Sequence, residues 1–220
     1  MKKIVLFEDA GYKNFVPLVK TRPLFELRNG IFSIRERFER IFGDYEIYYF
    51  YRKNFDPIMK KMGLKKLTDL GEGAQFTAVN ARIIPDRNFL KFFDVLISKK
   101  IKLAADDNGV LLCGTFTSKE EFVESVKKGV KTSIKPIFET TKYLWDVVNR
   151  TGEWIKHDFG LIRKEGKWSF PKSQGLIIEN KDNVLISKSA VIRPGVIIDA
   201  SEGPVVVDDE AEIMHHSVLL

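Results

Sequence analysis

The carboxyl-terminal stretch carries a six-residue rhythm that few folds can accommodate. From Val184 onward no helix signal remains, and large aliphatic residues recur at every sixth position with one three-residue insertion: Ile186, Ile192, Ile198, then Val207, Ile213 and Leu219. A second series of small or β-branched residues keeps the same step: Val184, Ala190, Val196, then Ala211 and Ser217. This pattern is typical of a β-helix, in which six residues form one side of a triangular coil and the aliphatic residue points inward. The sequence therefore predicts the first coils of a parallel β-helix over residues 176–220.

The length of the pattern separates a β-helix from ordinary strands. Two adjacent strands reproduce it over roughly twelve residues, whereas both series here continue over about thirty-five residues. Repeat arrays need several units and a capped end to be stable and soluble. Because the chain stops in mid-pattern on the apolar run Val218-Leu219-Leu220, we expect it to be part of a longer protein. The alternative is that another subunit covers the open end.

Residues 1–175 alternate strand signals with helix signals instead. Short apolar or aromatic runs predict strands at 3–8, 46–51 and 76–84, and a hairpin is predicted over 100–117 around Asp107-Asn108-Gly109. Periodic or capped stretches predict helices at 31–42, 85–99, 119–128 and 134–148. Such alternation predicts a Rossmann-like α/β domain, with a mixed, mainly parallel sheet and helices on both of its faces.

Two of these helices have clear start signals. Ser33 and Glu36 have capping-box spacing, as have Ser118 and Glu121. Glycines stand where the same two helices are expected to end, at Gly43 and Gly129.

Composition excludes several classes of protein. Cys113 is the only cysteine, so an internal disulfide is impossible and a reducing, cytoplasmic setting is expected. No run approaches the 18 or so apolar residues of a membrane span, and the amino terminus does not resemble a signal peptide. The net charge of +6 is spread along the chain without a basic arm or a stacking module. We therefore predict no nucleic-acid or membrane partner, and assign the charge to a lysine-rich surface or to phosphorylated small molecules.

Three groups of residues resemble one enzyme family. They are Val16–Arg28 with Gly30–Ile31 and Ile34–Glu36; Val79–Pro85 with Trp145–Asn149 and Gly152–Phe159; and Ala190–Val205. Together these look like the front part of the sugar nucleotidyltransferases related to the bifunctional N-acetylglucosamine-1-phosphate uridyltransferase. The resemblance implies a nucleotidyltransferase-like domain over residues 1–175 and a left-handed β-helix over 176–220. In such families the β-helix commonly forms homotrimers and often carries an acyltransferase site.

The resemblance also implies a reaction: a sugar 1-phosphate attacks the α-phosphate of a nucleoside triphosphate and releases pyrophosphate. Two anions meet in this step, so the site needs cations, and the family uses Mg²⁺. Arg22 and Lys20 are expected to be catalytic, because Arg22 matches the family's basic residue before a proline and arginine holds phosphate with two hydrogen bonds. The alternative for Arg22 is a structural ion pair with Glu26 or Glu36. The residues expected to bind nucleotide or sugar phosphate are Asp9, Gly11, Arg28, Asn80 and Arg82.

The chain departs from the family at two of these positions. The related enzymes have a Gly-x-Gly-x-Arg type loop after the first strand, whereas this chain has one glycine, Gly11, and two acids, of which Asp9 would either bind a metal or cap the turn. Asn80 stands where the active uridyltransferases place an aspartate that binds Mg²⁺, and an amide is the weaker ligand for a hard cation. Asp158 is the carboxylate that we expect to bind the metal instead, unless it is a surface acid beside His157.

Three functions remain open on the sequence alone. The first is an enzyme that makes a nucleotide-sugar, favoured by the Thr21-Arg22-Pro23 segment and the pairing of domains. The second is a degenerate module that binds a nucleotide or sugar phosphate without turnover, favoured by Asn80 and the altered first loop. The third is a β-helix acyltransferase whose site lies in further coils; His215 and His216 lie on the early coils, where a catalytic role is not expected, and His157 is expected to be structural.

Overall fold

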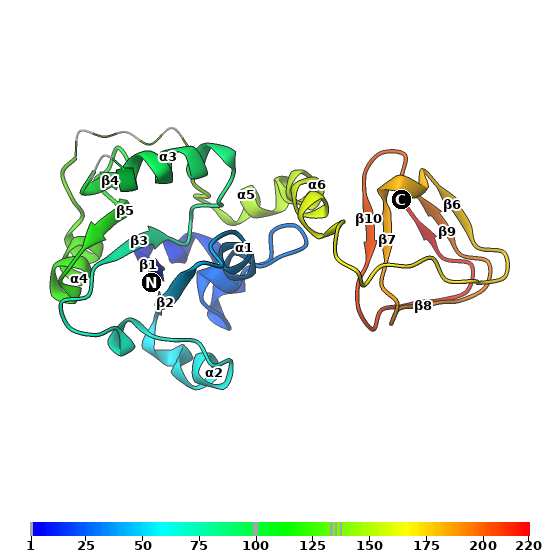
Figure 1. The fold of residues 1–220 in the computed structure, drawn as a ribbon, viewed down its shortest axis with the longest axis horizontal. Coiled ribbons are helices and arrows are strands. Elements are labelled where there is room, and N and C mark those ends of the chain that lie inside the picture. Colours follow the sequence, from blue (N-terminus) through cyan, green and yellow to red (C-terminus); the bar gives the residue numbers. More distant parts are fainter. Residues whose placement is uncertain (1, 99–100, 133, 135, 137) are drawn as a thin grey trace. The chain divides into compact units, whose positions relative to one another are not determined.

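The computed structural model describes residues 2–98, 101–132, 134, 136 and 138–220. Two compact units make up the chain (Figure 1): the first contains Met1–Arg28 and Phe32–Val148, and the second contains Asn29–Ile31 and Asn149–Leu220. The boundary between the two compact units thus lies after Val148. The boundary predicted between residues 175 and 176 was placed instead where the repeats begin. That boundary stays a prediction.

The first unit is built on a five-stranded sheet with the order β2-β1-β3-β5-β4. β1 (Lys2–Phe7) lies between β2 (Tyr45–Phe50) and β3 (Phe76–Asn80) and is parallel to both. β5 (Leu111–Phe116) is antiparallel to β3 and to β4 (Leu103–Ala105), with which it forms the predicted hairpin. All strands except β5 therefore run in one direction, and the predicted mixed, mainly parallel sheet is confirmed.

Side chains of β1 alternate between two hydrophobic cores. Ile4 and Leu6 belong to one core and Val5 and Phe7 to the other, and all four are 0% exposed. A strand that is buried on both faces needs apolar residues at consecutive positions. This requirement explains the unbroken apolar run Ile4–Phe7. The two cores lie on opposite faces of the sheet, and helices contribute to both of them, as predicted.

The helices differ from the prediction at several places. The described α-helices are α1 (Ile34–Ile41), α2 (Asp56–Lys61), α3 (Arg87–Ser98), α4 (Lys119–Lys128), α5 (Leu144–Asn149) and α6 (Thr151–Ile162). The 3-10 helices are η1 (Ala10–Phe15), η2 (Leu18–Lys20), η3 (Leu24–Glu26), η4 (Lys53–Phe55), η5 (Leu67–Asp69) and η6 (Lys181–Asn183). Neither α2 nor α6 was predicted.

The helix predicted over 134–148 was largely wrong. Its only described α-helical part begins at Leu144, because the chain before it is extended: Thr140 forms a bridge with Ile83, and the amide of Thr141 donates to the carbonyl of Arg82 at 2.8 Å. Tertiary pairing thus overrides the local pattern. Residues 135 and 137 of the predicted helix lie outside the described residues.

The capping box of α1 is present as predicted. The Ser33 hydroxyl accepts from the Glu36 amide at 3.2 Å, and the Glu36 carboxylate accepts from the Ser33 amide at 2.7 Å. At the other end the predicted glycine cap is absent, since Phe42 is the C-cap residue and Gly43 has no positive φ. Ser118 and Gly129 do cap α4 as predicted.

Replacing Ser33 with alanine is expected to lower the free energy of unfolding by about 1 kcal/mol, because a helix amide loses its acceptor. Urea denaturation followed by circular dichroism measures it. Ser118→Ala is the matched control: its hydroxyl also caps an amide, at 3.1 Å, but no reciprocal bond from Glu121 is described. A larger loss in Ser118→Ala than in Ser33→Ala would contradict the stabilising role of the reciprocal box.

In the second unit, α6 is followed along the chain by short parallel strands. They are β6 (Ile177–Glu179), β7 (Val184–Ile186), β8 (Val191–Ile192), β9 (Ile197–Asp199), β10 (Val205–Val207), β11 (Glu212–Ile213) and β12 (Val218–Leu219). Three separate small sheets form, with the orders β10-β7, β11-β8 and β12-β9-β6 (Figure 1).

The strand register of these sheets matches the aliphatic series of the sequence. Ile186 pairs with Val207, Ile192 with Ile213, and Ile198 with Leu219. The same side chains share one hydrophobic cluster with the buried members of the second series, Val184 and Val196. The predicted neighbours are therefore confirmed, while the left-handed β-helix itself stays a prediction. Across the described residues, none of the helices has the length and apolar character needed to cross a membrane.

Candidate functional site

Polar residues gather at the carboxyl ends of β1 and β3, where the strand order reverses. β1 is followed along the chain by β2 on one side, and the chain then crosses to β3 on the other side. In open α/β sheets ligands bind outside the carboxyl ends of the strands at such a switch point. Here Glu8 and Asp9 follow β1, Asn80 ends β3, and Arg82 lies two residues further on, all of them at most 6% exposed.

Asp9 is the centre of this polar cluster. One of its carboxylate oxygens accepts from the Gly11 amide at 2.9 Å and so caps η1. The other accepts from the Asn80 side-chain amide at 2.9 Å and from Nη2 of Arg82 at 2.7 Å. The Asn80 oxygen in turn accepts from the Arg82 backbone amide at 2.9 Å. The structure thus brings together Asp9, Asn80 and Arg82, three of the residues predicted from the sequence.

Gly11 is packed tightly against this cluster. A Cβ atom at this position would lie 2.9 Å from Asp9 Oδ1 and 3.3 Å from Arg82 Nε. Any larger residue at this position would force the Asp9 or Arg82 side chain to shift. Arg82 Nε itself is shielded from solvent and has no hydrogen-bond partner among the described residues, so one donor of this buried guanidinium is unsatisfied beside Gly11.

Glu8 makes a second buried ion pair, with Arg52, which the sequence analysis missed. Glu8 Oε1 accepts from the backbone amide and from Nε of Arg52, both at 2.8 Å, and its Oε2 accepts from the Leu24 amide at 3.0 Å. Arg52 Nη2 also donates to the carbonyls of Val19 at 2.9 Å and Arg22 at 3.2 Å. The only sequence signal is that Arg52 follows a predicted strand, at the edge where the carboxyl ends of parallel strands meet.

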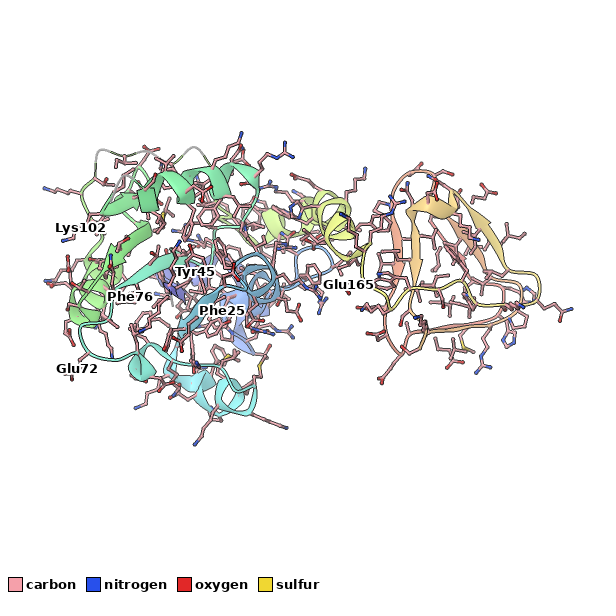
Figure 2. All side chains as sticks on the ribbon, in the orientation of Figure 1. Phe25, Tyr45, Glu72, Phe76, Lys102 and Glu165 are labelled. Atoms are coloured by element: carbon pink, nitrogen blue, oxygen red, sulfur yellow. The ribbon has the colours of Figure 1, made fainter. Side chains whose placement is uncertain are left out.

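Arg52 therefore holds the loop that carries Lys20 and Arg22. Its guanidinium lies over the Tyr12 ring at 3.9 Å and over the Phe55 ring at 4.7 Å. Phe25, which is labelled in Figure 2, lies in η3 after Arg22: it is 0% exposed, and its ring lies 5.1 Å from that of Tyr49. The loop is thus fixed from both sides.

The basic residues of the loop point to solvent. Lys20 and Arg22 are exposed, and within the described part of the chain neither side chain has an ion pair or hydrogen bond. The acids that were the structural alternative for Arg22 have other partners, since Glu26 pairs with Arg35 and Glu36 lies 3.7 Å from Arg28. Arg28 therefore lies beside the Glu36 carboxylate of α1, and its predicted role in binding phosphate stays a prediction.

Comparison with known proteins decides the family. The sugar nucleotidyl transferase family model matches residues 4–167. The chain belongs to this family. A search of curated proteins finds no match. The matched residues include β1 from Ile4 onward, β3 and the loop between Gly11 and Arg28, and so they include the whole Asp9 cluster.

The Asp9 cluster of this sugar nucleotidyl transferase family member does not fit a protein-bound Mg²⁺. Magnesium needs carboxylate or carbonyl oxygens that face it, but both oxygens of Asp9 accept hydrogen bonds from the chain, and the Asn80 oxygen accepts from Arg82. A cation is already present at Asp9, namely the Arg82 guanidinium. Among the described residues, no group of three or more histidine, cysteine, aspartate or glutamate side chains is arranged to hold a metal.

Asp158, the predicted metal ligand, belongs to the second unit. It is 0% exposed, so it is not the surface acid of the alternative interpretation. Its Oδ2 accepts from the Ile31 amide at 3.0 Å, and a Cβ on Gly30 would lie 2.7 Å from the same atom. Nδ1 of His157 lies 3.4 Å from its other oxygen. These contacts give Asp158 a role in holding the segment Asn29–Ile31, and its metal role stays a prediction.

Proposed function

We propose that this family member binds a nucleoside triphosphate and a sugar 1-phosphate at the carboxyl ends of β1 and β3 and joins them. A phosphate oxygen of the sugar 1-phosphate attacks the α-phosphorus, the bond from that phosphorus to the bridging oxygen of the β-phosphate breaks, and pyrophosphate leaves with the electron pair. The family match and the switch-point position support this proposal.

One observation carries the proposal to particular residues. Lys20 and Arg22 have cationic groups without partners among the described residues, on a loop whose backbone is fixed by Arg52. Preorganised cations lower the barrier between two anions because they need no rearrangement when the charge develops. We therefore assign Arg22 to binding the phosphates of the triphosphate, and Lys20 to stabilising the negative charge on the same phosphates. Asp9, Asn80, Arg82 and Gly11 hold the floor of this site in place.

Arg22→Ala is expected to raise the KM for the triphosphate about 10-fold to 100-fold, because a charge-assisted hydrogen bond contributes about 1.5–3 kcal/mol. Pyrophosphate release is measured with Mg²⁺, each of several nucleoside triphosphates and a panel of sugar 1-phosphates. The unfolding transition should not change, since the side chain is exposed. Arg163→Ala, which removes an exposed arginine of the second unit, is the control. An unchanged KM for the triphosphate in Arg22→Ala would contradict the assignment of Arg22 to its phosphates.

A second function has its own support in the Asp9 cluster. The Arg82 guanidinium neutralises the carboxylate that follows β1, so the chain has lost a negative charge that would attract a metal. A domain that binds nucleotide or sugar phosphate without turnover fits this arrangement. In that case the same assay gives no pyrophosphate from any pair of substrates, while a nucleotide or sugar phosphate still raises the melting temperature of the wild-type chain and does so less in Arg22→Ala.

We propose further that the small sheets of the second unit are coils of a left-handed β-helix. The support is that β7, β8 and β9 pair in turn with β10, β11 and β12, all in parallel and in the register of the aliphatic series. Each pairing joins one predicted side of a coil to the same side of the next coil. A homotrimer through these coils is the associated proposal, and sedimentation of the full-length protein tests it.

A further inference from the structure

A pocket of about 770 Å³ lies beside the end of β2 and is not part of the Asp9 cluster. Its lining comes from the end of β2 and the residue after it, from η4, from the first residue of α2, from η5 and the residue before it, and from one side of α4. The volume is within the range of about 300–1,000 Å³ that small-molecule sites have. All of these elements belong to the first unit.

The floor of this β2–α4 pocket is apolar. Phe50, Tyr51, Leu67 and Val123 supply the apolar surface. The Tyr51 ring is held by an edge contact to Phe25 at 6.0 Å between centroids, and its hydroxyl oxygen is shielded from solvent. Burial, and then the charge and hydrogen bonding of the nearby Asp56, raise the pKa of Tyr51 to about 12, so the hydroxyl stays protonated at neutral pH.

Lysines surround this floor and outnumber the acids. Five lysines and three acids line the pocket. Lys66 pairs with Asp56 at 2.8 Å, Lys128 pairs with Glu124, and Lys119 donates to the Thr68 carbonyl at 3.3 Å. The two others, Lys53 and Lys127, have no acid partner in the described ranges of the chain. The excess of positive charge selects an anion.

The chain between β2 and α2 separates this pocket from the proposed substrate site. Tyr51 and Lys53 line the β2–α4 pocket, while Arg52 between them reaches Glu8 and the Tyr12 ring. Consecutive residues of the segment that joins β2 to η4 thus face two different environments. A ligand in the pocket would contact both sequence neighbours of the arginine that fixes the loop of Lys20 and Arg22.

We propose that the β2–α4 pocket is a second ligand site, which takes a nucleoside phosphate with its flat ring on the apolar floor and its phosphates against Lys53 and Lys127. A flat ring matches the aromatic and aliphatic floor, and the phosphates meet the ammonium groups of Lys53 and Lys127, for which the described residues supply no acid partner. The inference goes beyond the proposed function and does not depend on it.

Calorimetric titration of the full chain with uridine, adenosine and guanosine diphosphates tests the site. The titration is run in Arg22→Ala, so that the proposed substrate site contributes little. Adding Lys53→Ala and Lys127→Ala is expected to weaken the remaining binding of the best diphosphate at least 10-fold. The charge-matched control adds Lys60→Ala and Lys61→Ala, which remove two exposed lysines of α2 that do not line the pocket, and should leave binding unchanged.

Three results would overturn the proposal: no diphosphate binds to Arg22→Ala, the Lys60 and Lys61 control weakens binding equally, or inorganic pyrophosphate binds as tightly as the nucleotides. The first two deny the site, and the third denies the role of the apolar floor. Pyrophosphate release by the wild-type chain is measured separately. If pyrophosphate is released but no diphosphate binds in the β2–α4 pocket, the proposed function stands and the second site does not. If a diphosphate binds there but no pyrophosphate is released, the second site stands and the proposed function does not.

Discussion

Arg82→Met is expected to lower the free energy of unfolding of the first unit by about 3–5 kcal/mol, because it leaves the Asp9 carboxylate buried without its cation. The two side chains are 7% and 3% exposed and meet at 2.7 Å, so water cannot replace the lost partner. For a chain of this length such a loss lowers the melting temperature by roughly 6–20 °C. Methionine keeps most of the side-chain volume, so the change removes charge and hydrogen bonds more than packing.

Cys113 provides a direct measurement of this loss. It is the only cysteine, it pairs with Val79 of β3 from the neighbouring strand β5, and it is 0% exposed. Burial raises the pKa of its thiol to about 12, so the thiol reacts only when this part of the sheet opens. Labelling by a thiol reagent should therefore be much faster in Arg82→Met than in the wild-type chain under native conditions.

The double variant Asp9→Asn with Arg82→Met supplies the control. The Asn side chain keeps an oxygen for the Gly11 amide but carries no buried charge, so the double variant should be more stable than Arg82→Met alone. This positive coupling is what an ion pair predicts for two residues in contact. Additive losses in the two single variants, or a loss below about 1 kcal/mol in Arg82→Met, would show that the pair does not hold the floor of the site.

Local signals in the sequence account for the parts of the fold that were predicted correctly. The stacking of Ile186 on Val207 and of Ile192 on Ile213 follows from a repeat that is counted directly along the chain. The capping box of Ser33 is equally local, because its partner is three residues away. Turn residues likewise determined the hairpin, where the amide of Asp106 donates to the Val110 carbonyl at 3.1 Å around Gly109.

Long-range partners account for the parts that the sequence did not reveal. Asp9 and Arg82 were each selected from their own surroundings, one as a metal ligand or a turn cap and the other as a phosphate ligand, and nothing local showed that they pair across 73 positions. Arg52 was missed for the same reason, since Glu8 lies 44 positions away. The helix expected over 134–148 failed because Thr140 bridges Ile83, a contact that no periodicity encodes.

Arg52→Met is expected to destabilise the first unit by about 3–5 kcal/mol and to release the loop of Lys20 and Arg22. Glu8, 2% exposed, loses its cation, and the carbonyls of Val19 and Arg22 lose their donor. Trypsin cleavage after Lys20 under native conditions measures the release and should become at least several-fold faster, as local opening costs less free energy.

Arg52→Lys separates the charge of Arg52 from its geometry. Lysine keeps a cation near Glu8 but has no planar fork to reach the carboxylate and two carbonyls together, so it should restore much of the stability while the loop stays easy to cleave. Under the proposed function this variant also raises the KM for the triphosphate, because Arg22 is no longer held in position before the ligand arrives. If the peptide bond after Lys20 were fully protected from trypsin in Arg52→Lys, charge alone would fix the loop. The hydrogen bonds from Arg52 to the carbonyls of Val19 and Arg22 would then not position Arg22 for binding phosphate.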